Sequence, residues 1–174
     1  MGFGEKVESY IKQAAEAEAV RYEEDVHCII QRCESPIEAL LTSALYTHNK
    51  IGLENFHFMT MAKEVAKPYF YEAAFVYFQM PIGTYRADLL IVDASLPLEL
   101  GEPRLMIVEC DGHDYHERTK EQARKDKQRD RYFQGRGYKV LRFTGSEIWA
   151  DPDACASEIA DQLACNEHFR SRNR

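Results

Sequence analysis

The chain has 174 residues and a formal net charge of −7, with 45% hydrophobic and 29% charged residues. This length and composition are typical of one globular domain with its own core. No apolar stretch approaches the roughly 20 residues of a membrane-spanning helix, so no membrane partner is expected. The five cysteines include no C-x-x-C pair, which argues against a structural zinc site and favours a reducing, cytoplasmic location.

The charge is unevenly distributed along the chain. Residues 117–142 contain ten basic and four acidic side chains, a local balance of +6, so the rest of the chain carries −13. A concentrated basic patch on an acidic body can still bind a polyanion locally. Nucleic acid therefore remains an expected class of partner.

The first third of the chain is predicted to be largely helical. Residues 5–32 place apolar side chains at helical spacing, although Glu18 interrupts the stripe. This acidic segment is predicted to form one or two helices that act as a cap or pair in a homodimer. Ser35-Pro36-Ile37-Glu38 supplies an N-cap, a proline at the first helical position and a capping-box glutamate, which predicts a helix to about Thr47. Residues 49–69 show little periodicity and are predicted to be a loop with a short helical piece.

The rest of the chain alternates between apolar runs and helical patterns. A hairpin is expected where Pro81-Ile82-Gly83 separates two strands. A crossover helix, stopped by Gly135 and Gly137, joins the last two strands and favours their parallel pairing. The predicted strands are 70–80, 85–92, 105–111 and 139–143, and the predicted helices that follow the hairpin are 115–134, a short one from Thr144, and 153–163. The expected fold is α/β, with four strands in a mixed sheet flanked by helices in the order α-β-β-β-α-β.

Two carboxylates end the third predicted strand. Because side chains alternate along a strand, Ile107, Glu109 and Asp111 share one face, and Val108 and Cys110 share the other. Burying carboxylates is costly unless a positive charge meets them, and hard divalent cations such as Mg²⁺ prefer carboxylate oxygen. This pattern points to metal-assisted chemistry on a phosphate substrate, with Asp88 on the neighbouring strand as a second ligand.

Each acidic residue also has a purely structural interpretation. Asp88 can bond to Arg86 or to a backbone amide, and Glu109 can pair with Arg142 on the next strand. Asp111 precedes a glycine and can cap the following helix. Glu38 suits a capping box, yet it shares a helix face with Leu41 and Leu45 and can therefore also look inward.

The predicted crossover helix carries two polar faces. One contains Gln122, Asp126 and Arg129 and should pack toward the sheet, where Gln122 is suited to contact substrate or a water molecule. The other is a basic stripe that either is merely solvated or follows a phosphate backbone. The stripe comprises Lys120, Arg124, Lys127 and Arg131, with Arg118 just before it. His116, one turn before Lys120, is the preferred general acid or base, because imidazole titrates near neutrality.

These motifs, taken in order, resemble the PD-(D/E)XK nuclease superfamily. The resemblance rests on Asp88, Glu109-x-Asp111-Gly112, the Asp126-x-x-Arg129 helix and the strand Gly137–Phe143. Together with the Ser-Pro-Ile-Glu helix start, they are similar to a branch related to very-short-patch-repair endonucleases. The resemblance covers about residues 34–163. It suggests a restriction-endonuclease-like nuclease domain over 34–166, an N-terminal extension over 1–33 and a tail over 167–174.

The resemblance implies a nuclease that uses Mg²⁺ or Mn²⁺ and acts on DNA, with RNA less favoured. The ligands it implies are Asp88, Glu109 and the backbone carbonyl of Cys110, with Asp111 and Glu38 completing or tuning the shell. The chain departs from the family pattern at Asp111, where the family has a lysine that helps to orient or deprotonate the attacking water. That role is left to His116, Lys120, Gln122 or the metal alone. The alternatives are a non-catalytic nucleic-acid-binding or assembly module on the same fold, or a protein-interaction domain.

Overall fold

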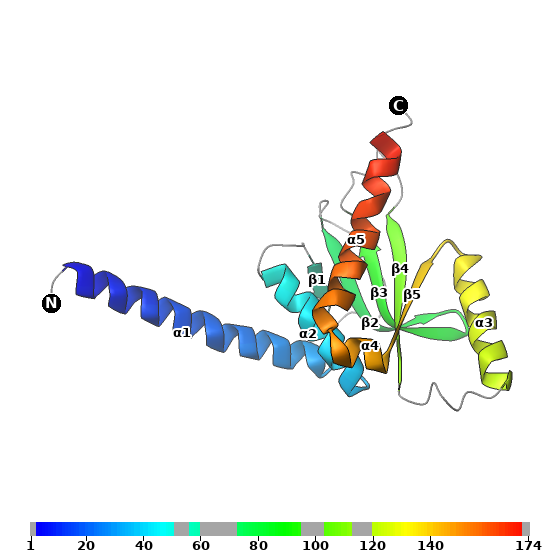
Figure 1. The fold of residues 1–174 in the computed structure, drawn as a ribbon, viewed down its shortest axis with the longest axis horizontal. Helices are drawn as coiled ribbons and strands as arrows, with labels where there is room; N and C mark the ends of the chain where they lie inside the picture. Colours follow the sequence, from blue (N-terminus) through cyan, green and yellow to red (C-terminus); the bar gives the residue numbers. More distant parts are fainter. Residues whose placement is uncertain (1–2, 51–55, 60–72, 95–102, 113–119, 172–174) are drawn as a thin grey trace.

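A computed structural model of the chain describes residues 3–50, 56–59, 73–94, 103–112 and 120–171. The described residues form five helices and five strands (Figure 1). In chain order these elements are α1 (Phe3–Ile30), α2 (Pro36–Lys50), β1 (Phe56–Met59), β2 (Ala74–Ile82), β3 (Tyr85–Asp93), β4 (Arg104–Asp111), α3 (Lys120–Gln134), β5 (Lys139–Thr144), α4 (Gly145–Ala150) and α5 (Pro152–Ser171).

The strands form one mixed sheet in the order β1-β2-β3-β4-β5. The pairs β2–β3 and β3–β4 are antiparallel, whereas β1–β2 and β4–β5 are parallel. The α/β class, the hairpin and the parallel last strand are as predicted from the sequence. The expected count of four strands is wrong, because β1 lies inside the segment predicted to be a loop. Its four residues are too few to show a period-2 pattern, and its pairing with β2 defines it.

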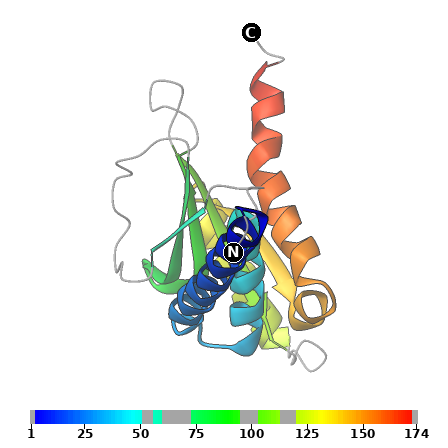
Figure 2. The same ribbon diagram turned by 90° about the vertical axis from the view of Figure 1, so that its left-hand side faces the viewer.

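Helices cover both faces of the sheet (Figures 1 and 2). On one face, α2, α4 and α5 enclose a core that includes Leu41, Leu45, Val76, Leu89, Val108, Ile148 and Ile159. On the other face, Phe133 of α3 is fully buried among Tyr77, Leu90 and Ile107. The alternation predicted for β4 is present, since Ile107 belongs to the α3 side while Val108 and Cys110 belong to the α2 side.

Helix α1 extends away from the body of the molecule (Figure 1). Its last turns pack against the core through Tyr22, Val26 and Ile29. Its earlier apolar side chains, among them Tyr10 and Ile11, are exposed. The interruption at Glu18 falls between these two parts of the helix. The proposed division at residues 33 and 166 remains a prediction.

The helix ends follow the capping signals in the sequence. The Oγ of Ser35 accepts a hydrogen bond from the amide of Glu38 at 3.3 Å, and Thr144 forms a complete capping box with Glu147. Helix α5 continues to Ser171, well beyond the predicted end at 163, while residues 115–119 of the predicted crossover helix lie outside the described residues. No helix within the described ranges combines the length and the apolar character needed to span a bilayer.

Candidate active site

Polar side chains form a row across β2, β3 and β4, where the pairing of β3 with β4 ends. Where β2 and β3 pair, Phe78 lies opposite Leu89 and Met80 lies opposite Ala87. Gln79 therefore lies opposite Asp88. Where β3 and β4 pair, Leu89 lies opposite Val108. The next position along the two strands, just past this last pair, places Asp88 opposite Glu109. On β5, Arg142 pairs with Glu109 in register. Three adjacent strands therefore bring Gln79, Asp88 and Glu109 side by side.

At this row, the regular alternation of side chains between the two faces of the sheet is broken in β2 and β3. In β2, Phe78 belongs to the core on the α2 side and Met80 to the core on the α3 side, although residues two apart in a strand normally share a face. In β3, Leu89 and Ala87 are divided in the same way. Gln79 lies between the divided residues of β2 with a φ of +48°, a left-handed conformation that is unfavourable for a non-glycine residue. The strain therefore lies beside the candidate carboxylates, where strained backbone is often functional.

Glu38 is buried at the start of α2 and is held from two directions. Its Oε2 accepts hydrogen bonds from the backbone amide of Glu34 at 2.9 Å and from the Nε2 of Gln79 at 2.7 Å. The capping-box alternative is therefore only half realised, because the side chain bonds to the amide of Glu34 rather than to that of Ser35. This leaves Glu38 as a connection between α2 and the row of polar residues on the sheet.

Asp88 is half-buried and accepts a hydrogen bond from the amide of Cys110 at 2.9 Å through its Oδ2. This bond matches the backbone-amide alternative raised from the sequence, whereas Arg86 pairs with Glu34 instead. Burial raises the pKa of Asp88, and the nearby charge of Glu38 raises it further, while the amide of Cys110 opposes both. Asp88 is thus electrostatically coupled to the other acids of the site.

Glu109 is the most buried of these acids, with 2% of its side chain exposed. Burial, followed by repulsion from Asp88, raises its pKa to about 8. Arg129 of α3 donates from Nη2 to the Oε2 of Glu109 at 2.5 Å. The Oε1 of Glu109 and the Nε of Arg129 are buried and lack hydrogen-bond partners among the described residues. The ion pair suggested by the sequence therefore exists, but with Arg129 in place of Arg142.

Arg142 binds a second pair of acids beside Glu109. It donates to the Oδ1 of Asp111 at 3.1 Å and to the Oδ1 of Asp130 at 2.7 Å. Asp111 and Arg142 line a cavity of about 440 Å³ together with Asp126, Lys127 and Asp130 of α3. The cavity therefore joins the end of β4 to the basic stripe.

The donor atoms of the site are of the kind that a hard cation prefers, but among the described residues their arrangement is not that of a metal shell. Carboxylate oxygens from Asp88, Glu109 and Asp111, and a backbone carbonyl at Cys110, are the ligand types that Mg²⁺ and Mn²⁺ prefer. The unpartnered Oε1 of Glu109 is a buried acceptor that a cation would satisfy. Within the described part of the chain, however, no three His, Cys, Asp or Glu side chains are grouped as a metal shell. Glu109 and Asp111 face arginines instead.

The remaining predicted site residues lie on or before α3. Arg124, Lys127 and Arg131 are exposed along this helix, as a solvated or phosphate-binding stripe requires. Lys120 and Gln122 belong to α3, and the structure describes their backbone alone. His116 and Arg118 lie outside the described residues.

One residue of the site was not found from the sequence, and the partner of a second was not predicted. Gln79 lies in an aromatic run that predicts an ordinary strand, and no local pattern marks its left-handed backbone. Arg129 was placed on the inward face of its helix, yet its expected partner was Asp126, three positions away on the same helix. The inward position of an arginine on a helix that packs against Glu109 was the one signal available.

Comparison with known proteins gives one match. A family model described as REase_MTES_1575 matches residues 63–163, more than half of the chain. No curated protein and no solved structure matches. The matched segment contains Gln79, Asp88, Glu109 and Arg129, whereas Glu38 lies outside it. The mixed sheet flanked by helices agrees with this match and with the PD-(D/E)XK superfamily, and the chain belongs to the REase_MTES_1575 family, a restriction-endonuclease-like family.

Proposed function

We propose that this protein is a metal-dependent phosphodiesterase that cuts DNA, with RNA as the less favoured substrate. The observation that carries the proposal is the buried Glu109. One of its carboxylate oxygens lacks a hydrogen-bond partner among the residues that the structure describes, and it lies beside Asp88 in a chain of a restriction-endonuclease-like family. A buried acid with a strongly raised pKa at the end of a strand is typical of a functional site.

Mg²⁺ or Mn²⁺ would be held by Asp88, Glu109 and the backbone carbonyl of Cys110, with Asp111 and Glu38 completing or tuning the shell. Such a cation lowers the pKa of a water molecule and neutralises charge that develops on a phosphate. The chain's own contribution is to fix these acids. The amide of Cys110 orients Asp88, and the amides of Glu34 and Gln79 orient Glu38.

Arg129 has two properties that suit a substrate contact. Its guanidinium already lies against Glu109, and a quarter of its side chain is exposed. Arginine binds phosphate through a planar fork of donors. We propose that Arg129 would contact the scissile phosphate, with Glu109 among the residues that would hold the cation.

Proton transfer and backbone binding are assigned to α3 and the residues before it. His116, Lys120 and Gln122 are the proposed groups that position water, in place of the motif lysine that Asp111 replaces. Arg118, Lys120, Arg124, Lys127 and Arg131 would hold the phosphate backbone. Lys127 supports this assignment, since it lines the same cavity as Asp111.

The proposal is tested by cleavage of linear and supercoiled DNA with Mg²⁺, Mn²⁺ or EDTA. We expect cleavage with either metal and none in EDTA. Glu109→Gln should abolish cleavage while the circular dichroism spectrum stays unchanged. The matched control is Glu158→Gln, an exposed glutamate on α5, which should cleave as the wild type does. Equal activity of both variants would overturn the assignment of Glu109.

A second candidate function is a nucleic-acid-binding or assembly module without catalysis. It is favoured by the ion pairs that Glu109 and Asp111 form with arginines, and by the aspartate at the lysine position of the motif. In this case DNA binding should survive Glu109→Gln. Binding should weaken, with a shallower salt dependence, when Arg124, Lys127 and Arg131 are changed to glutamine.

Two finer assignments are also proposals. The likeness to very-short-patch-repair endonucleases is supported by the order of motifs, from the Ser-Pro-Ile-Glu start of α2 to the Asp126-x-x-Arg129 pair of α3. A cytoplasmic location is supported by the cysteine pattern of the sequence.

A further inference from the structure

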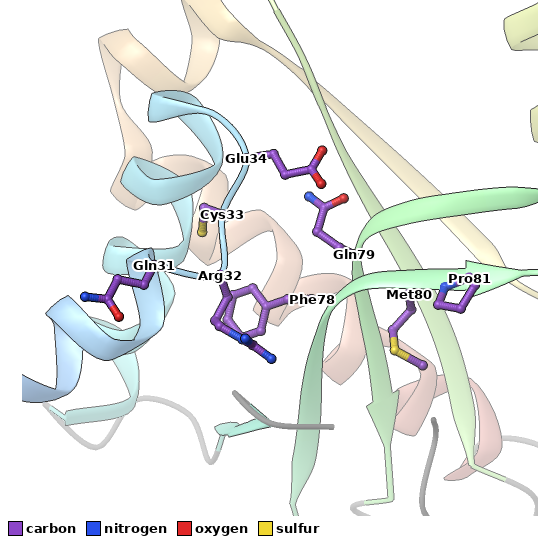
Figure 3. A pocket seen from close by; sticks show the side chains of 8 residues that line it. All are labelled: Gln31, Arg32, Cys33, Glu34, Phe78, Gln79, Met80 and Pro81. Carbon is purple, nitrogen blue, oxygen red and sulfur yellow. The ribbon is translucent and has the colours of Figure 1, made fainter. Parts of the chain in front are cut away.

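A second pocket lies next to the candidate active site, between the α1–α2 connection and β2 (Figure 3). Its volume of about 490 Å³ falls within the roughly 300–1,000 Å³ of small-ligand pockets. Figure 3 shows Arg32, Cys33 and Glu34 on one side and Phe78, Gln79 and Met80 of β2 on the other. We call this space the Gln79 pocket.

Gln79 belongs both to this pocket and to the candidate active site. Its Nε2 donates to Glu38, and its strand position is opposite Asp88. Its Oε1 is buried and lacks a hydrogen-bond partner among the described residues. A buried amide oxygen without a donor costs free energy, as does the left-handed backbone of this residue. A ligand that donates an N–H to Oε1 would offset the first of these costs.

The other groups of the pocket favour a nucleobase as that ligand. Arg32 is exposed and makes no ion pair among the described residues, so its guanidinium is available to a base edge or a phosphate. Phe78 and Met80 also line the pocket, but they are 8% and 3% exposed and belong to the cores on opposite faces of the sheet, so they close its wall rather than offer a stacking face. Arginine and glutamine are side chains that commonly read base edges, and each base carries an N–H for the Oε1 of Gln79.

The other polar side chains of the pocket are already paired. Glu34 pairs with Arg86, and the side-chain amide of Gln31 bonds to the ring of His27 at 2.8 Å. The thiol of Cys33 donates to the Oγ1 of Thr42 at 3.7 Å, and burial raises the pKa of this thiol to about 11. It therefore stays protonated near neutral pH and does not act as a nucleophile. This pocket is equipped for binding rather than for chemistry of its own.

We infer that the Gln79 pocket seats one base of the DNA strand next to the scissile phosphate, with Gln79 and Arg32 contacting it. This inference rests on the proposed function, since the neighbouring acids define where the strand is cut. Gln79 is then the residue that couples base binding to the position of Glu38, because one amide group serves both.

The inference is tested by binding rather than by cleavage. The probe is a fluorescein-labelled single-stranded DNA oligonucleotide in EDTA, with fluorescence anisotropy as the readout. Gln79→Gly removes the side chain and tolerates the positive φ. We expect this variant to bind about tenfold more weakly. Arg32→Ala should also weaken binding. The matched control is Gln162→Ala, a glutamine on α5 that bonds to Lys139, and it should bind as the wild type does.

A second probe separates base contact from backbone contact. An oligonucleotide of the same length with abasic positions throughout offers the phosphates without the bases. The affinity for this probe should not change in Gln79→Gly. An equal loss for both probes, unchanged binding of the normal oligonucleotide, or no binding by the wild type would each overturn the base pocket. A wild type that binds as expected but never cleaves would instead overturn the proposed nuclease function and leave the pocket standing.

Discussion

Glu109 is an acid whose surroundings favour its protonated form. Burial and the neighbouring Asp88 raise its pKa from 4.5 to about 8, while Arg129 opposes the shift. Between these two values the folded state binds more protons than the unfolded state. The contribution of Glu109 to stability is therefore full below about pH 4.5 and is lost as the pH rises through about 8.

This sign gives a measurable pH dependence. We expect the free energy of unfolding, from urea titrations at several pH values, to fall across this range in the wild type. Glu109→Gln should make the slope shallower without removing it, because the pKa of Asp88 is also raised by burial. Glu158→Gln should retain the wild-type slope. An unchanged slope in Glu109→Gln would show that this carboxyl does not titrate in the range.

Arg129 supplies the countercharge of Glu109 when no metal is bound. At pH 9, above the pKa of about 8 of Glu109, Arg129→Met leaves this buried carboxyl without its countercharge, and we expect a loss of about 2–3 kcal/mol of stability in EDTA. This is below the roughly 3–5 kcal/mol of a fully buried pair, because Arg129 is 25% exposed. If Asp88 and Glu109 hold a cation, Mn²⁺ should raise the melting temperature of the variant more than that of the wild type. Arg129→Lys is the control, since it keeps the charge. An equal Mn²⁺ response in all three proteins would contradict a cation at Glu109.

At the scale of elements, long periodic segments could be predicted from the sequence. The strand before Asp111, the hairpin and the helix start at Ser35-Pro36 follow from alternation, turn residues and capping. Strand β1 could not be predicted, since four residues carry no reliable period. The sequence also does not reveal that the side chains of β2 change faces at Gln79. Both faces of β2 are apolar, so the hydrophobic pattern fits either orientation of the strand.

The candidate site could be predicted in composition but not in pairing. The spacing of Asp88, Glu109 and Asp111 indicated which acids meet at one end of the sheet. Which arginine neutralises which acid depends on how α3 packs, and the sequence alone does not determine that packing. Arg142 is directly opposite Glu109 in register, yet it turns to Asp111 and Asp130, and Arg129 reaches Glu109 from the helix.

The β2–β3 hairpin is fixed to α3 by a close contact at its turn. Gly83 has a φ of +63°, and a Cβ added there would lie 1.8 Å from the hydroxyl of Tyr132. We expect Gly83→Ala to lower stability by about 2–3 kcal/mol, because it combines the left-handed penalty of about 1–2 kcal/mol with this overlap. The measurement is urea unfolding.

A double variant separates the two causes. Tyr132→Phe removes the hydroxyl, although the ring carbon that carried it remains 3.0 Å from the added Cβ. Gly83→Ala should therefore cost less in the Tyr132→Phe background than in the wild type. An equal cost in both backgrounds would assign the whole effect to the backbone and contradict the contact.

At the scale of the whole molecule, α1 has two parts: its last turns pack against the core, and its earlier turns are exposed. Ile29 is 4% exposed and part of the core, whereas Tyr10 and Ile11 are 73% and 61% exposed. Compared with the full chain held as a monomer by Ile11→Glu, removal of the chain before Arg21 should therefore change the free energy of unfolding by less than about 0.5 kcal/mol, as surface changes usually do. Ile29→Ala in the full chain should cost about 2–4 kcal/mol. A large loss on truncation would show that the first part of α1 supports the fold.

The same truncation tests the homodimer expected from the sequence. A helix with no packed face is only marginally stable in water, so an exposed apolar stripe on α1 favours a helix partner. A second copy of the chain offers the same stripe, with Val7, Tyr10 and Ile11 on one side of the helix. Light scattering after size exclusion should then give twice the chain mass for the full protein and the single mass for the truncated one. Ile11→Glu in the full chain should also give the single mass, because it places a charge in the stripe. A single mass for all three proteins would refute self-association through α1.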